Sequence, residues 1–104
     1  MDKAKRNRLE AKGWKVGSAA DFLGLTPEEE ALIEIKLALA RTLRKRRQKR
    51  MTQAQLAAKL RSSQPRVAKA EGGDASVSLE LLVRAMLATG ATPKEIGKAI
   101  ATPR

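Results

Sequence analysis

The chain has 104 residues, enough for one small domain with a short extension, and its 42% hydrophobic content allows a core. Its 22 Lys and Arg against 11 Asp and Glu give a net charge of +11, which favours a polyanionic partner. Cys and His are absent and no apolar run reaches about 18 residues, so we expect no metal or cofactor, no histidine-based enzyme and no membrane span.

Residues 1–25 are predicted to form an extension that is separate from a domain over residues 26–104. The extension begins as a basic arm, interpreted as mobile, with an inert tail as the alternative. It continues as a glycine-rich stretch that holds both aromatic residues, Trp14 and Phe22. The glycines argue against a long helix, and the two aromatic side chains are expected to pack on the domain or on a partner.

A long helix is predicted from Pro27 to about Lys49. Thr26 is a suitable cap, and the proline and glutamates after it fit a capping box at the helix start. One apolar stripe at helical spacing consists of Leu32, Ile35, Leu39 and Leu43. Ile33 and Leu37 lie off this stripe, which predicts a second cover from an arm, a second subunit or another protein. The local alternation also fits a strand, but the Glu, Ala, Leu and Lys background favours helix.

Two short helices follow. Thr52 with Gln at the third position repeats the capping pattern before a helix over 53–60, whose buried side is Leu56, Ala57 and Leu60. Ser63 caps a helix over 64–70, where Pro65 is tolerated in the first turn. Two glycines, Gly72 and Gly73, end this second helix.

The last two helices complete an all-α, five-helix prediction. Ser78 caps the first of them, which ends at Gly90. Its predicted apolar face consists of Leu79, Leu82, Val83, Met86 and Leu87. A third capping box, from Thr92 to Glu95, opens the final helix, with Ile96 and Ile100 as its anchors.

The helices over 53–60 and 64–70 have the properties of a helix-turn-helix. Ala57 is small enough for a close crossing, and Leu56, Leu60 and Val67 are spaced to hold it. The outer side of the second helix carries Gln64, Pro65, Ala68 and Lys69, with Arg66 beside them. Residues 35–70 contain twelve basic residues and no acidic one, which predicts a one-sided positive surface.

Residues 51–73, MTQAQLAAKLRSSQPRVAKAEGG, resemble the DNA-binding motif of the lambda-repressor-like XRE family. The positions in register are Thr52, Gln53, Leu56, Ala57, Ser63, Val67, Glu71 and Gly73. The resemblance covers about residues 32–100 and implies a five-helix lambda-repressor-like domain with its motif at about 52–73. There are two departures. Arg61 stands where relatives usually have Gly, so it needs a positive φ or a different turn, and residues 44–50 lack the usual spaced aliphatics.

The resemblance implies a role for each position. The side chains expected to read bases are Gln64, Pro65 and Lys69. Those expected to bind DNA phosphate are Thr52, Gln53, Arg61, Ser63 and Arg66. Those expected to hold the motif together are Leu56, Ala57, Val67 and Glu71, the last paired with Arg46 or Arg47. Two alternatives stay open: Gln53 caps its helix only, and Arg66 and Lys69 are solvated surface charges.

The predicted function is sequence-specific binding of double-stranded DNA by a regulator. We expect a homodimer on a palindromic operator, acting as a repressor of its own gene, in the bacterial cytoplasm and associated with the nucleoid. The alternative is an antitoxin of a type II toxin–antitoxin pair that also neutralises a RelE-like toxin, because GWKVGSAADFLGLTPEEE before the motif resembles such antitoxins. RNA binding is disfavoured because the chain has only two aromatic residues on which bases could stack.

Overall fold

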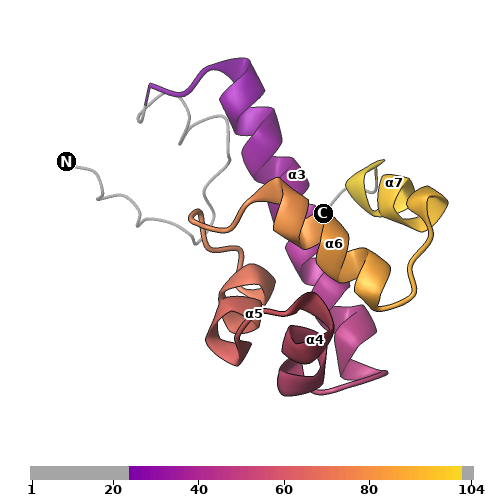
Figure 1. Ribbon diagram of the computed structural model, residues 1–104. Coiled ribbons are helices and arrows are strands. Elements are labelled where there is room, and N and C mark those ends of the chain that lie inside the picture. Colours follow the sequence, from indigo (N-terminus) through magenta and orange to yellow (C-terminus); the bar gives the residue numbers. More distant parts are fainter. Residues whose placement is uncertain (1–23, 102–104) are drawn as a thin grey trace. The chain divides into compact units, whose positions relative to one another are not determined.

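The computed structural model describes residues 24–101, and all regular structure in that range is helical. The helices are α3 (Pro27–Gln48), α4 (Gln53–Leu60), α5 (Gln64–Glu71), α6 (Leu79–Ala88) and α7 (Pro93–Ala101) (Figure 1). The predicted all-α fold with five helices is therefore confirmed. The predictions for the arm, Trp14 and Phe22 lie outside the described residues. The chain divides into two compact units, residues 1–34 and residues 35–104, and the division falls within α3.

In the first unit, the predicted helix start is present. The Thr26 hydroxyl accepts from the Glu29 N–H at 3.1 Å, and the Glu29 carboxylate accepts from the Thr26 N–H at 2.7 Å, which completes a capping box. The predicted apolar stripe is wrong at Leu32, which is 45% exposed, and Ile33 is 38% exposed. Helical periodicity identifies the apolar side of a helix but not how far along the helix that side is covered.

The core of the second unit is aliphatic and takes side chains from α3, α4, α5, α6 and α7. Five large side chains are almost completely buried: Leu39 and Leu43 of α3, Leu56 of α4, and Leu82 and Met86 of α6. Val67 of α5 is 2% exposed and belongs to the same cluster. Each such side chain contributes roughly 1.5–3 kcal/mol through burial. The helix-turn-helix pair is thus fixed to α3 and α6 by one continuous core.

The apolar face of α6 differs from the predicted one. Leu81 and Ala85 are buried beside Leu82 and Met86, whereas Leu87 is 47% exposed. The buried set follows the spacing i, i+1, i+4, i+5, which is also a helical face. Leu79 and Val83 of the predicted face are partly buried against the same core, so Leu87 is the one member of that face that is exposed.

The final helix begins as predicted but is anchored at one position only. Thr92 and Glu95 form its capping box, with the Glu95 carboxylate 2.8 Å from the Thr92 nitrogen. Ile96 is 7% exposed and lies in the core, but Ile100 is 38% exposed, so its predicted anchoring role is wrong. The turn that holds Ile100 is covered only in part, where the half-buried Ala99 packs against the core.

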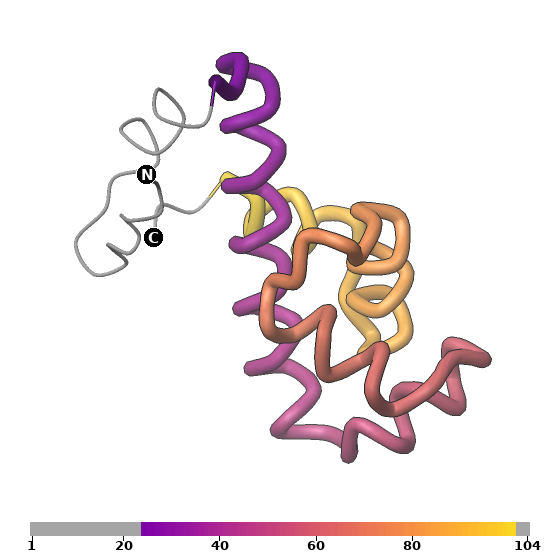
Figure 2. Tube along the Cα trace, turned by 90° about the vertical axis from the view of Figure 1, so that its left-hand side faces the viewer, coloured from indigo at the N-terminus to yellow at the C-terminus, as the bar shows by residue number. Residues whose placement is uncertain are grey.

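The loop between α5 and α6 lies against α3, as Figure 2 also shows. The ammonium group of Lys36 donates to the carbonyl of Ala75 at 3.2 Å. Gly73 has a φ of +75°, and a Cβ there would lie 2.7 Å from the Leu37 side chain. Leu37 is half-buried. The cover predicted over Leu37 therefore comes in part from the chain itself, at a glycine that permits both the backbone conformation and the close approach.

Candidate nucleic-acid interface

The crossing of α4 and α5 has the predicted helix-turn-helix construction. Leu56, Ala57 and Leu60 are buried on α4, and Val67 and Ala70 are buried on α5. The cap of α4 is a complete capping box between Thr52 and Gln55. Ser63 caps α5 by accepting from the Arg66 N–H at 3.3 Å. The two helices are in extensive contact, so the exposed side of α5 is held on a rigid support (Figure 1).

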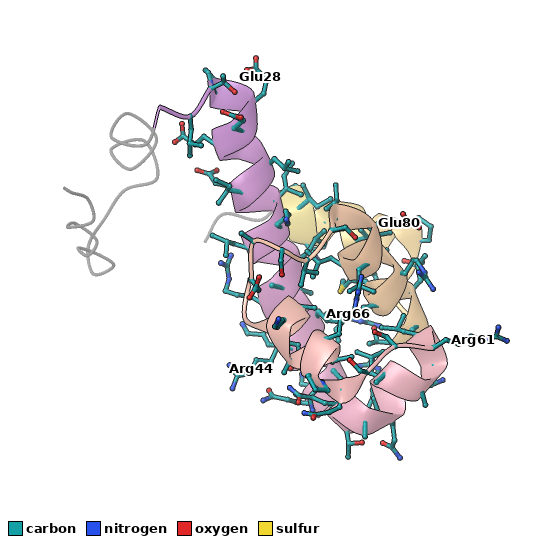
Figure 3. The ribbon with its side chains drawn as sticks, turned by 60° about the vertical axis from the view of Figure 1, so that its left-hand side comes forward. Glu28, Arg44, Arg61, Arg66 and Glu80 are labelled. Atoms are coloured by element: carbon teal, nitrogen blue, oxygen red, sulfur yellow. The ribbon has the colours of Figure 1, made fainter. Side chains whose placement is uncertain are left out.

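Of the two alternatives expected at Arg61, a positive φ and a different turn, the structure has the positive φ. Its backbone has φ 54° and ψ 45°, the left-handed conformation that ends many helices at glycine. The Arg61 N–H donates to the carbonyl of Ala58 at 3.2 Å, and the Ser62 N–H donates to that of Ala57 at 2.9 Å. The Arg61 side chain is exposed and extends away from the protein (Figure 3).

The exposed face of α5 is the one the sequence predicts. Gln64, Pro65, Arg66 and Lys69 are exposed, whereas the inward side of the helix is buried. Ser63, Pro65, Arg66 and Lys69 line a small depression of about 270 Å³ together with Ser76 and Val77 of the following loop. The side of α5 that faces solvent therefore carries polar and cationic groups and no carboxylate.

An ion pair holds α5 to α3. The Arg47 guanidinium donates to both carboxylate oxygens of Glu71, from Nε at 2.6 Å and from Nη2 at 2.8 Å, and the Glu71 side chain is 3% exposed. Burial alone would raise the pKa of Glu71. Hydrogen bonds from Arg47 and Gln53, with the charges of Arg47 and Arg44, outweigh it and hold that pKa below its usual value. Of the two predicted partners, Arg47 is the correct one.

Arg46, the other predicted partner of Glu71, binds different residues. Its Nε donates to the buried hydroxyl of Thr89 at 3.0 Å, and Nη1 lies 3.9 Å from the Glu95 carboxylate. The two neighbouring arginines therefore contact different helices, Arg47 the end of α5 and Arg46 the end of α6 and the start of α7.

A chain of hydrogen bonds, which no local sequence pattern predicts, continues from the ion pair to the exposed start of α5. The Gln53 amide nitrogen donates to the Glu71 carboxylate at 3.1 Å. The Gln64 amide nitrogen in turn donates to the Gln53 amide oxygen. Gln53 was expected at phosphate or as a cap. In the structure, its side chain links the buried Glu71 to Gln64.

The N-terminus of α4 opens on a shallow depression. The depression has a volume of about 700 Å³ and is lined by residues 47–55 and Gln64. The backbone N–H of Thr52 was predicted to bind a phosphate. In the structure it already donates to the Gln55 amide oxygen at 2.8 Å. Within residues 24–101, no acceptor meets the N–H groups of Gln53 and Ala54. These two groups, beside Arg50, are positioned to bind an anion at a helix N-terminus.

Metal sites and membrane-spanning helices were both searched for among the described residues. The described residues contain no group of three or more acidic, Cys or His side chains that could hold a metal ion. Among those same residues, no helix is both long enough and apolar enough to span a bilayer.

Comparison with known proteins identifies a family. Residues 38–98, more than half of the chain, match the sequence profile of a family described as a helix-turn-helix domain. No curated protein and no solved structure gives a significant match. The matched range begins inside α3 and ends inside α7, so it includes the ion pair, the hydrogen-bonded glutamines and both helices of the motif.

Proposed function

The chain belongs to the helix-turn-helix domain family, within the XRE-like superfamily, and from this premise we propose that it binds specific sequences in double-stranded DNA. One observation carries the proposal. The exposed face of α5 consists of polar and cationic side chains, while the opposite face is buried and fixed by the Arg47–Glu71 ion pair. A helix held in this way fits the major groove, which is wide enough to admit it.

In this proposal, three side chains of α5 read bases. Gln64 offers a donor and an acceptor together, the pattern that matches adenine. Lys69 lies about one turn further along and would donate to the guanine acceptors. Pro65 has no polar atom in its side chain, so it would make an apolar contact, for example with a thymine methyl group.

Phosphate groups on either side of the groove would be bound by the surrounding cations and N–H groups. Arg61 extends from the turn, and Arg66 lines the depression beside α5. The free N–H groups of Gln53 and Ala54 would bind a second phosphate at the start of α4. Thr52 and Ser63 accept hydrogen bonds at their hydroxyl oxygens and keep a hydroxyl hydrogen to donate.

The regulatory role follows from this mode of binding. A single short recognition helix reads only a few base pairs, so two copies on half-sites about one helical turn apart would give a useful site length. We propose a homodimer that represses its own gene, with residues 1–25 as an extension outside the DNA-binding domain 26–104.

The proposal is tested by fluorescence anisotropy on a duplex from the region upstream of the gene and on a shuffled duplex, over a series of salt concentrations. We expect the upstream duplex to be preferred as salt rises, because non-specific binding is lost first. Arg66→Ala should lower the salt dependence by about one phosphate contact. Arg84→Ala removes the same charge from α6, outside the motif, and should leave it unchanged. Equal binding of both duplexes at every salt concentration contradicts the proposal.

A second function, neutralisation of a toxin, is favoured by the apolar surface on the first half of α3. Leu32 and Ile33 are 45% and 38% exposed. We propose that a protein partner covers them, as in an antitoxin of the type that neutralises a RelE-like toxin. Co-expression with the product of a neighbouring small reading frame tests this. The double variant Leu32→Ser, Ile33→Ser should lose neutralisation and keep DNA binding. Failure to bind or neutralise any neighbouring product contradicts it.

A further inference from the structure

The charges of α3 are separated along the helix. The half-buried Glu30 and the exposed Glu34 belong to its first half, whereas Arg41 and Lys45, both exposed, belong to its second half. None of these four side chains makes a hydrogen bond or an ion pair with another residue in the range 24–101. All four charges are therefore left for a partner outside the described part of the chain.

The same four residues recur on one side of α3. Successive intervals from Glu30 through Glu34 and Arg41 to Lys45 are four, seven and four residues, and residues at such intervals share a side of an α-helix. Leu37 fills the gap in this row, three residues after Glu34 and four before Arg41, and is half-buried. The row is acidic at one end, apolar in the middle and basic at the other end.

Electrostatics within α3 does not account for this row. The helix dipole favours acidic residues in the first turn and basic residues in the last turn, which covers Glu30 and Lys45. Glu34 and Arg41 lie in the interior of the helix, where this effect has faded. Each of them also stands four residues from a like charge, an arrangement that destabilises a helix. Opposite charges from outside α3 would remove this cost.

We propose that the row is a contact between two copies of this chain, with their α3 helices antiparallel. A two-fold axis between Leu37 and Ala38 places Glu34 of each copy opposite Arg41 of the other, and Glu30 opposite Lys45, because the members of each pair are equally far from the axis. The two Leu37 side chains meet at the centre. Parallel helices would bring like charges together, so the row also determines the direction of pairing.

The contact is expected to be weak and sensitive to salt. Exposed ion pairs contribute little individually, and the net charge of +11 on each copy opposes association. This inference rests on the homodimer of the proposed function and assigns its contact surface. Leu32 lies two residues from both Glu30 and Glu34, or roughly 200° round the helix, so a protein that covers Leu32 would bind another side of α3.

The test is analytical ultracentrifugation without DNA at about 50 mM and about 500 mM salt, over a range of protein concentrations. Arg41→Glu with Lys45→Glu makes the row entirely acidic. Glu30→Lys with Glu34→Lys makes it entirely basic. Each variant alone has only like charges across the contact, whereas an equimolar mixture of the two restores every opposite-charge pair.

Arg84→Glu with Lys94→Glu is the matched control. It reverses two exposed cations on α6 and α7 and changes the net charge as much as the acidic variant does. If net charge alone governed association, both would associate more strongly than the wild type, because each lowers the repulsion between copies. Circular dichroism sets a temperature at which all variants are folded, and Glu and Lys are both good helix formers.

We expect the wild type and the control to dimerise at low salt and to dissociate as salt rises. Each α3 variant alone should have a dimer dissociation constant higher by about tenfold or more, and their mixture should form the dimer that neither forms alone. A monomeric wild type, an α3 variant that dimerises like the wild type, or a mixture that stays monomeric overturns the inference. A wild type that dimerises but shows no preference for the upstream duplex contradicts the proposed DNA recognition and supports this contact.

Discussion

Replacement of Arg61 by glycine should make the protein more stable, although it deletes a side chain. Arg61 ends α4 with φ 54° and ψ 45°, a conformation that brings Cβ close to the following carbonyl oxygen. Arg61 is the only non-glycine residue with positive φ in the described part of the chain. Its side chain is exposed and makes no hydrogen bond or ion pair with the described residues, so few contacts are lost with it.

The magnitude follows from two opposing effects. The left-handed conformation costs roughly 1–2 kcal/mol for a residue with a Cβ. Glycine removes that cost but gives the unfolded chain more freedom, which lowers stability by about 0.4–1 kcal/mol. The net gain for Arg61→Gly over Arg61→Ala is therefore about 0.5–1 kcal/mol. In a domain of this size, that difference raises the midpoint of thermal unfolding by roughly 2–8 °C.

The assay is urea and thermal unfolding, followed by circular dichroism, for the wild type, Arg61→Gly and Arg61→Ala. Alanine is the matched control, because both variants lose the guanidinium and only glycine relieves the backbone. The two variants should also show the same weakened salt dependence of DNA binding if Arg61 contacts a phosphate. A glycine variant that is no more stable than the alanine variant would refute the conformational argument.

Three further predictions concern stability. Gly73→Ala should destabilise by about 1–3 kcal/mol in urea unfolding, because it adds a Cβ 2.7 Å from Leu37 at a φ of +75°. Gly72→Ala, at φ −86°, should change stability by less than about 0.5 kcal/mol, and equal effects would contradict this reading. Leu56→Ala should lower the free energy of unfolding by about 2–5 kcal/mol, since Leu56 is 0% exposed. A decrease of less than about 1 kcal/mol would contradict the central place of Leu56 in the core. The lowered pKa of Glu71 predicts a stabilisation that is complete above the pKa of an unfolded Glu, about 4.3, and is lost as the pH falls through the lower folded-state value. The stability difference between wild type and Glu71→Gln should therefore narrow from about pH 6 to about pH 3, and a constant difference would argue against the ion pair.

Local sequence signals predicted the ends of the helices well. Each of the Thr and Ser caps, at Thr26, Thr52, Ser63, Ser78 and Thr92, makes the hydrogen bond expected of it. Capping depends on residues within one turn, so the necessary information is contiguous in sequence. The buried side of α5 was predictable for the same reason, because its spacing leaves a single apolar face.

Features that depend on distant contacts were less predictable. Leu87 and Ile100 are apolar and correctly spaced, but only the neighbouring helices decide whether they are covered. Arg47 was not distinguished from Arg46 in the sequence. The structure shows the reason: Arg47 lies four residues after the buried Leu43 and continues the buried side of α3 towards Glu71.

The role of Gln53 was the largest omission at the candidate interface. Its position beside a cap predicted a role at the start of α4, whereas its side chain bonds to Glu71, eighteen residues away, and to Gln64, eleven residues away. No local pattern signals a hydrogen bond between three side chains on two helices. Such a contact follows from the crossing geometry, which fixes which polar groups meet.

The most direct test of the central claim is the ratio of the affinities for the upstream duplex and its shuffled counterpart, measured by anisotropy at raised salt for the wild type and for Gln64→Ala. If α5 reads bases through Gln64, the wild type should prefer the upstream duplex and the variant should lose about 1–3 kcal/mol of that preference, with unchanged affinity for the shuffled duplex. If the variant weakens binding to both duplexes equally, Gln64 does not read a base, and if the wild type itself binds both duplexes equally, the protein binds DNA through its charge alone.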